Sequence, residues 1–360
     1  MNQHHIHNLL SPEELISNLP INAHQERFVA QSREVIKHVL DGKDSRFLLI
    51  IGPCSIHDIA STKEYARKLS QLVQSMKNAF QIVMRVYFEK PRTSLGWKGF
   101  LYDPWLNGTC DIQSGLIHAR QLLIDLADME IPAGTEFLDP FTAHYFGDLI
   151  SWGCIGARTS SSPIHRQLAS ALPMPVAFKN STEGSVSNAI HGIISAASQH
   201  SHMSFNHHGV TVVQTNGNPD CHIVLRGGER SPNYDPQSIS KTLALLKNAN
   251  LPQRVLVDCA HDNSFKEHEK QQIVFESVLQ QVVRGNESIR GALLESHLYP
   301  GKQSFPLDPS QLQYGVSLTD GCLGWEQTER LIKWAYELLK GHSEESQQEE
   351  IAAYETSAMQ

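Results

Sequence analysis

The 360-residue sequence predicts an α/β protein, a closed (β/α)8 barrel of the TIM type, and two observations lead to this fold class. Short apolar runs typical of buried parallel strands occur eight times between residues 47 and 295. Amphipathic segments with helical spacing separate most of these runs. Strands and helices that alternate in this way build a parallel sheet, and eight such units close into a barrel.

An N-terminal extension, residues 1–45, precedes the first expected strand. Ser11 stands before Pro12, with Glu14 three residues after Ser11. This is the pattern of a capping box with proline at the first helical position, so a short helix is expected here. Apolar residues at helical spacing predict a second helix over residues 24–40.

The barrel domain is expected to cover residues 46–340. Its strands are predicted at residues 47–52, 82–88, 133–138, 152–157, 176–179, 221–226, 254–259 and 290–295. Helices are predicted between them at residues 61–76, 116–129, 186–197, 236–248 and 265–284. Ser61 and Glu64 resemble a second capping box at the start of the first of these helices. Residues 201–218 contain two β-like runs around His208 and Gly209, which predicts an inserted β-hairpin.

The composition excludes several classes of protein. A formal net charge of -8 and a pI near 6.2 argue against nucleic acids or acidic membranes as partners. The sequence has neither an apolar run of membrane-spanning length nor a signal peptide at its start, so we expect a cytoplasmic protein. Its six cysteines form no CxxC pair, and we expect their thiols to be reduced. Residues 341–360 carry five glutamates and no Lys or Arg, which predicts a disordered acidic tail.

Positively charged residues stand at the predicted carboxyl ends of the strands, where barrel enzymes place their chemistry. They are Arg85, Lys90, Arg158, Lys179 and Arg226, and Glu136 stands among them. Any one of these cations alone is more simply explained by a neighbouring acid. Together they would repel one another unless anions bind between them. We therefore expect substrates with more than one anionic group, such as a phosphate and a carboxylate.

Four further residues form a mixed set of soft and hard ligands: Cys54, His261, Glu295 and Asp320. The four are scattered and have no local metal-binding signature, so without the barrel they would be interpreted as a core cysteine, a satisfied histidine and surface acids. In a closed barrel, however, strands seven, eight and one are consecutive neighbours. This arrangement favours a site for a divalent transition ion with positions open to substrate.

Several long motifs resemble one known family. They are IGPCSIHD (51–58), MRVYFEKPRTSLGWKG (84–99), IGART (155–159), FKN (178–180), GNPDCHIVLRGG (217–228), ESHL (295–298) and YGVSLTDGCLGWE (314–326). The chain resembles class I 3-deoxy-D-arabino-heptulosonate 7-phosphate (DAHP) synthases over nearly its whole length apart from the acidic tail. The resemblance implies a transferase that condenses phosphoenolpyruvate with D-erythrose 4-phosphate and releases phosphate, the first step of the shikimate pathway to chorismate and the aromatic amino acids.

The resemblance also implies roles for single residues. It makes Cys54, His261, Glu295 and Asp320 the ligands of one divalent metal ion, with Mn²⁺ first and Fe²⁺, Co²⁺ or Zn²⁺ as alternatives. Phosphoenolpyruvate would contact Arg85, Lys90, Glu136, Arg158, Lys179 and Arg226. Erythrose 4-phosphate would contact Arg92, Thr93 and Asp320. On chemical grounds we further expect Lys90 and Glu136 to be catalytic: Lys90 would donate a proton to the developing alkoxide, and either Glu136 or a metal-bound water would aid the addition of water.

Relatives of this length also suggest regulation and assembly. The N-terminal extension and the hairpin are expected to build an inhibitory site for tyrosine or phenylalanine in a homodimer or homotetramer; alternatively, the extension serves assembly alone. Ala260 and Asp262 depart from the family pattern beside His261, as do residues 160–163 and 181–184, and we expect Asp262 to alter the metal preference. Two rival functions are 3-deoxy-D-manno-octulosonate 8-phosphate synthase and a non-catalytic regulator that binds an aromatic amino acid.

Overall fold

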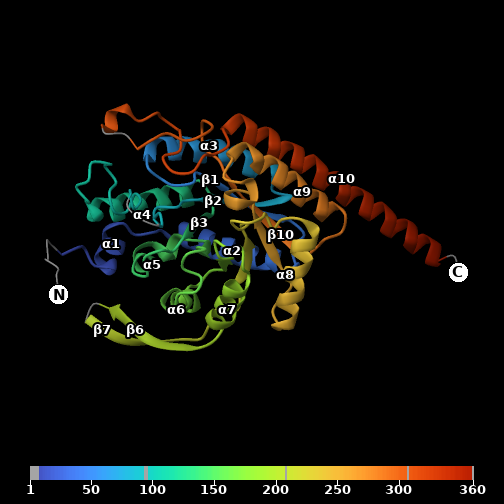
Figure 1. The fold of residues 1–360 in the computed structure, drawn as a ribbon, viewed down its shortest axis with the longest axis horizontal. Coiled ribbons are helices and arrows are strands. Elements are labelled where there is room, and N and C mark those ends of the chain that lie inside the picture. The colour runs from blue at the N-terminus through green and yellow to red at the C-terminus, as the bar shows by residue number, and fades with distance from the viewer. Residues whose placement is uncertain (1–7, 93–95, 207–208, 306–307, 359–360) are drawn as a thin grey trace.

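The protein is described by a computed structural model that covers residues 8–92, 96–206, 209–305 and 308–358. Eight parallel strands close into a barrel in the order β1-β10-β9-β8-β5-β4-β3-β2, which confirms the predicted fold class (Figure 1). These strands are β1 (Phe47–Gly52), β2 (Phe80–Arg85), β3 (Ala133–Glu136), β4 (Trp152–Ile155), β5 (Val176–Lys179), β8 (His222–Leu225), β9 (Val255–Asp258) and β10 (Ile289–Glu295). Each lies within or close to a predicted apolar run, because only apolar side chains can fill the barrel interior and the layer beneath the helices.

Helices surround the barrel and cover one of its ends. They are α1 (Pro12–Asn18), α2 (Ala23–Leu40), α3 (Ile59–Met76), α4 (Ile112–Asp128), α5 (Thr142–Phe146), α6 (Pro163–Ala171), α7 (Ser187–Ala196), α8 (Pro236–Asn248), α9 (Gln271–Val283) and α10 (Trp325–Ala358). Ile36, Val39 and Leu40 of α2 belong to the same buried cluster as Leu48 and Ile50 of β1. The extension therefore also closes the floor of the barrel, opposite the carboxyl ends of the strands.

Helix starts follow the local capping chemistry. At α1 the predicted capping box is present, with Ser11 and Glu14 each accepting the other's backbone N–H. At α3 the expected capping box at Ser61 is wrong. Asp58 caps this helix instead, since its carboxylate accepts the backbone N–H groups of Ala60 and Ser61.

The start of the helix expected over residues 265–284 is not α-helical: the 3-10 turn η2 (His261–Ser264) precedes it, and a second 3-10 turn, η3 (His268–Lys270), lies within it. His261, Phe265 and Lys266 all have positive φ angles, so this segment cannot be α-helical. The helix itself begins only at Gln271. A tight, irregular loop thus follows β9 at the mouth of the barrel.

The inserted hairpin consists of β6 (His200–Asn206) and β7 (Gly209–Thr215), which pair antiparallel and lie apart from the barrel (Figure 1). The expected turn around His208 and Gly209 is only partly described, because residues 207–208 lie outside the described residues and Gly209 begins β7. Met203, Val210 and Val212 are strongly exposed on the hairpin, at 79%, 65% and 74% of their full accessible area.

The tail differs from its expected disorder. Residues 341–358 continue α10, and in Figure 1 the end of this helix extends beyond the barrel. The tail is rich in Glu, Gln and Ala, which are strong helix formers, and it follows a segment whose Leu331, Ile332 and Ala335 are buried. A packed first half and favourable propensity in the second explain the continuation.

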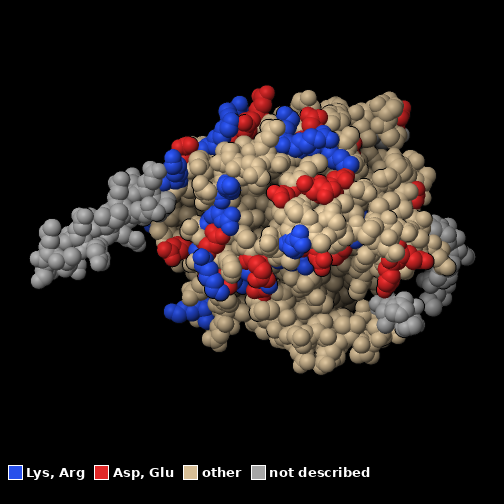
Figure 2. Space-filling model, turned by 180° about the vertical axis from the view of Figure 1, so that it is seen from behind, with Lys and Arg blue, Asp and Glu red and all other residues tan. Residues whose placement is uncertain are grey.

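The surface opposite the view of Figure 1 carries interspersed Lys, Arg, Asp and Glu side chains over its upper part and few charged side chains along its lower edge (Figure 2). No helix among the described residues is both long and apolar enough to cross a bilayer.

Candidate active site

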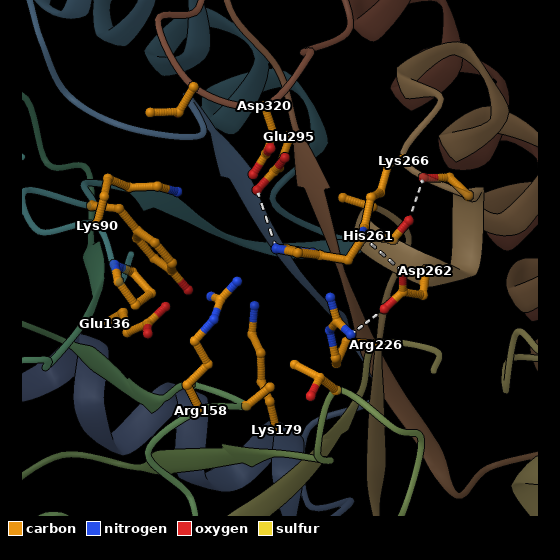
Figure 3. A pocket seen from close by; sticks show the side chains of 18 of the residues that line it. Lys90, Glu136, Arg158, Lys179, Arg226, His261, Asp262, Lys266, Glu295 and Asp320 are labelled. Carbon is orange, nitrogen blue, oxygen red and sulfur yellow. Dashed lines mark hydrogen bonds and ion pairs between the residues drawn. The ribbon is translucent and has the colours of Figure 1, made fainter. Parts of the chain in front are cut away.

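The candidate site is a cavity of about 560 Å³ at the carboxyl ends of the barrel strands. Arg85, Glu136, Lys179 and Glu295 are the last residues of β2, β3, β5 and β10, and all four line it. The loops that follow the strands add further side chains, namely Lys90, Arg92, Arg158, Arg226, His261 and Asp320. Figure 3 shows Lys90, Arg158, Lys179 and Arg226 around the same opening as Glu136. Residues distant in the sequence are therefore brought to one place by closure of the barrel.

Three of the four predicted metal ligands form a compact group. Ligand atoms of Cys54, Glu295 and Asp320 all lie within 4.8 Å of one another. His261 lies beside them, with its Nε2 3.9 Å from Glu295 Oε1. A sulfur, two carboxylates and an imidazole that converge in this way suit a divalent transition ion.

Burial and charge act in opposite directions on the acids of this group. Burial, reinforced by Glu295, raises the pKa of the Cys54 thiol to about 12, although Lys90 opposes the change. Burial also acts to raise the pKa of Asp320, but Lys90 and His261 outweigh it and leave this pKa below its usual value. Without a metal ion, the site therefore favours a protonated thiol beside an ionised carboxylate, and the Cys54 Sγ lies 3.6 Å from Asp320 Oδ2.

Arg85 is fully buried under the metal-ligand group. Its Nη2 donates to Glu295 Oε1 at 3.0 Å, and its guanidinium stacks 4.0 Å from the ring centre of Tyr87. Two other guanidinium nitrogens, Nε and Nη1, have no hydrogen-bond partner among the described residues. Buried donors are rarely left unsatisfied, so these two atoms mark a place for an anionic ligand.

Lys179 and Asp258 form a buried ion pair across the barrel, with Lys179 Nζ 2.7 Å from Asp258 Oδ2. The same carboxylate oxygen lies 3.0 Å from His261 Nδ1. Burial acts to raise the pKa of Asp258, but His261 and Lys179 outweigh it and hold the pKa well below the usual range. Asp258 thus fixes both a predicted substrate-binding cation and a predicted metal ligand.

Arg226 is paired with Asp262 by a direct contact between Nη1 and Oδ2. Asp262 Oδ1 lies 3.7 Å from the Nζ of Lys266, whose side chain is 71% exposed. Figure 3 shows Asp262 between these two cations. Asp262 therefore places a carboxylate on a predicted substrate-binding arginine.

The remaining predicted residues surround the cavity. Arg158 is exposed at its edge and forms no ion pair with another described residue. Glu136 lies against Gly156, where an added Cβ would stand 2.1 Å from Glu136 Oε1, so a larger residue there would displace the Glu136 carboxylate. Arg92 lines the cavity and donates to the backbone oxygen of Trp97 at 2.8 Å. Thr93 lies outside the described residues.

Another buried carboxyl group, that of Glu89, supports the loop that carries Lys90. Glu89 accepts from the backbone N–H of Asp139 at 3.1 Å and from the Thr142 hydroxyl at 3.1 Å. Tyr102 donates to Asp139 Oδ2 at 2.9 Å. Burial, with help from Asp139, raises the pKa of Glu89 to about 8. The loops after β2 and β3 are thereby joined by a carboxyl that stays protonated at neutral pH.

Sequence reasoning missed three of these residues: Asp258, Tyr87 and Glu89. Asp258 carried a usable signal, because a carboxylate at the end of an apolar strand needs a cation beside it. Tyr87 carried none, since an aromatic residue after an apolar strand is ordinary core. The burial of Glu89 could not be predicted, because Glu89 stands next to Lys90 in the sequence and such a pair of opposite charges is typical of an exposed loop.

Comparison with known proteins identifies the family of the chain. The sequence pattern of the DAHP synthetase I family matches residues 18–333. The Tyr-sensitive phospho-2-dehydro-3-deoxyheptonate aldolase of Salmonella typhimurium is 45% identical over 92% of this chain and 94% of its own. The Phe-sensitive enzyme of Escherichia coli is 45% identical over 91% of this chain and 93% of its own.

A solved structure of phospho-2-dehydro-3-deoxyheptonate aldolase from Francisella tularensis superposes with a TM-score of 0.91. It is 40% identical in sequence, and the match covers 94% of this chain and 99% of that one. The resemblance inferred from the motifs is confirmed. The chain belongs to the DAHP synthetase I family and is a 3-deoxy-7-phosphoheptulonate synthase, an enzyme of the first step of the shikimate pathway.

Proposed function

We propose that the cavity binds phosphoenolpyruvate through Arg85, Lys90, Arg158, Lys179 and Arg226, with Glu136 beside them, and joins it to D-erythrose 4-phosphate. The two unpartnered nitrogens of buried Arg85 are the observation that carries this proposal, because they need an anionic acceptor. The exposed guanidinium of Arg158, with no acid paired to it among the residues described, supports it further. Arg92, Thr93 and Asp320 are proposed to hold the erythrose 4-phosphate.

One divalent ion is proposed to bind at Cys54, His261, Glu295 and Asp320, with Mn²⁺ first and Fe²⁺, Co²⁺ or Zn²⁺ as alternatives. The close approach of the three ligand atoms and the nearby imidazole supports this assignment. When bound, such an ion would supply Lewis acidity toward the aldehyde oxygen of the second substrate.

Lys90 is proposed as the proton donor to the alkoxide oxygen that develops when the new carbon–carbon bond forms. Burial acts to lower the pKa of Lys90, but Cys54 and Asp320 outweigh it and raise the pKa, so the ammonium group holds its proton. Glu136 is proposed to assist the addition of water to the carbon that carries the phosphate. The surrounding cations stabilise the charge on the departing phosphate.

The test is release of inorganic phosphate from phosphoenolpyruvate with either erythrose 4-phosphate or arabinose 5-phosphate, with and without a chelator. We expect release with erythrose 4-phosphate alone, and loss of it with the chelator. Preference for arabinose 5-phosphate would instead indicate the octulosonate synthase, and no turnover with either aldose would indicate a non-catalytic regulator.

Inhibition by tyrosine or phenylalanine and assembly into a homodimer or homotetramer are also proposed. Relatives that are Tyr-sensitive and Phe-sensitive match at the same 45% identity, so identity alone does not choose the effector. The exposed Met203, Val210 and Val212 of the hairpin support assembly, since apolar residues on a projecting strand pair commonly pack on another subunit. Light scattering and inhibition assays with each amino acid test both points. A cytoplasmic location is proposed as well.

A further inference from the structure

The contact between Asp262 and Arg226 introduces a negative charge into a cavity proposed to bind anions. The Arg226 side chain is only 7% exposed and that of Asp262 is 12% exposed, so water screens the pair weakly. Among the described residues, Asp262 is the only acidic side chain within 4 Å of the Arg226 guanidinium.

The backbone around this pair is tightly fixed. Gly227 follows Arg226 with a φ of +78°, and an added Cβ there would stand 2.6 Å from the backbone carbon of Asp262. Asn263 donates from its side chain to the backbone oxygens of Leu225 and Asp258, at 3.1 and 2.9 Å. The loops after β8 and β9 are thus held together by the Asn263 side chain and by close backbone packing at Gly227, and neither contact involves the Asp262 carboxylate.

The Asp262 side chain nevertheless has an alternative partner. Lys266 Nζ lies 3.7 Å from the other carboxylate oxygen and belongs to an exposed side chain at the cavity rim. A small rotation of the carboxylate would transfer it from Arg226 to Lys266 without moving the backbone. The charge would still be paired after the transfer.

We propose that Asp262 is an internal competitor for Arg226: its carboxylate pairs with the guanidinium in the free enzyme and moves to Lys266 when an anionic group of the substrate arrives. The proposal rests on the proposed role of Arg226 in binding phosphoenolpyruvate. While Asp262 pairs with Arg226, the guanidinium is not available to the incoming anion. The apparent affinity for the anion is then the intrinsic affinity multiplied by the fraction of molecules in which Arg226 is free. Asp262 is accordingly a specificity and positioning residue, and it weakens the binding of phosphate-bearing ligands.

The test compares Asp262→Asn with the matched variant Glu229→Gln. Glu229 lines the same cavity, is exposed and forms no ion pair with Arg226, so its replacement removes the same charge without freeing the guanidinium. Inorganic phosphate is the probe, titrated by calorimetry into each metal-loaded enzyme. Thermal unfolding of each variant checks that it is folded, and Asp262→Ala serves as a second variant that cannot donate a hydrogen bond to a neighbour.

For Asp262→Asn we expect phosphate to bind roughly five- to tenfold more tightly, and the KM for phosphoenolpyruvate to fall by a similar factor. The KM for erythrose 4-phosphate should not move, and Glu229→Gln should change phosphate binding less than twofold. Weaker or unchanged phosphate binding in both Asp262 variants would overturn the proposal, because it would make Asp262 a support for Arg226. An equal gain in Glu229→Gln would overturn it as well, because the effect would then come from net charge alone.

The two proposals fail in different ways. Phosphate binding is measured without turnover, so a wild-type enzyme that lacks activity with both aldose phosphates refutes the proposed function while the comparison of variants still decides the role of Asp262.

Discussion

The Nζ of Lys90 lies 3.1 Å from the Sγ of Cys54. One of these residues is the proposed proton donor and the other a proposed metal ligand, so the ammonium group sits where it meets both the metal-ligand group and the substrate cavity. Its positive charge favours the thiolate that a metal ion needs. The chemical step and the metal site therefore share one contact.

Lys90→Met should reduce kcat by about 10²- to 10⁴-fold, the range expected for loss of a general acid. Metal stoichiometry should remain near one ion per chain, because the four proposed ligands are untouched. Phosphate release and metal analysis of the same preparation check both expectations. Full activity in the variant would exclude Lys90 as the donor.

Metal affinity should rise with pH. The Cys54 thiol has a pKa raised to about 12 in the metal-free protein, so a bound ion must displace its proton, and apparent affinity gains about tenfold per pH unit below that value for one proton released. Competition titrations at several pH values measure the slope. Cys54→Ser provides the control, because it removes the thiol and should flatten the slope. An affinity independent of pH in the wild type would contradict the role of Cys54.

Asp258→Asn should destabilise the fold by about 3 kcal/mol, since it leaves the buried Lys179 ammonium without its partner. The double variant with Lys179→Met should recover part of this loss. Urea unfolding measures both. The exposed pair of Glu329 and Lys333 supplies the comparison, where Glu329→Gln should cost about 0.5 kcal/mol or less. An equal loss of unfolding free energy in Asp258→Asn and Glu329→Gln would show that the buried pair stabilises the fold no more than the exposed pair does.

Glu89 should make stability depend on pH. Its pKa is raised to about 8, whereas the unfolded chain releases the same proton near 4.5, so the stability that Glu89 contributes is present at low pH and is lost as pH rises toward 8. In Glu89→Gln this dependence disappears. The difference in unfolding free energy between variant and wild type should therefore change by about 2 kcal/mol in favour of the variant between pH 6 and pH 8. A difference in unfolding free energy between variant and wild type that is the same at pH 6 and pH 8 would refute the assignment.

The sequence allowed the barrel and most site positions to be predicted because both follow from local patterns. A buried strand such as residues 47–52 must be apolar along its length, and a charged residue that ends a strand, such as Arg85 at the end of β2, lies at the mouth of the barrel. The partner of each charge could not be predicted in this way. Asp258 and Lys179 stand 79 positions apart, and only the register of the closed sheet brings them together.

Asp262 illustrates the same limit. Its position next to His261 suggested an effect on the metal, and that effect stays a prediction. In the structure its carboxylate contacts Arg226, because the loop after β9 turns the Asp262 side chain toward the end of β8, where Arg226 lies. Side-chain direction in an irregular loop depends on φ angles such as the +57° of His261, which no sequence pattern specified.

Pairing between β1 and β10 closes the barrel, with Gly52 opposite Glu295. Cys54, just after the first strand, and Glu295, at the end of the last, therefore come from opposite ends of the domain. During synthesis on the ribosome, the thiol emerges long before the carboxylate that it needs as a neighbour. A nascent chain thus holds all four proposed ligands only after β10 and the segment up to Asp320 have been made, so the proposed ion could be bound only once the sheet can close.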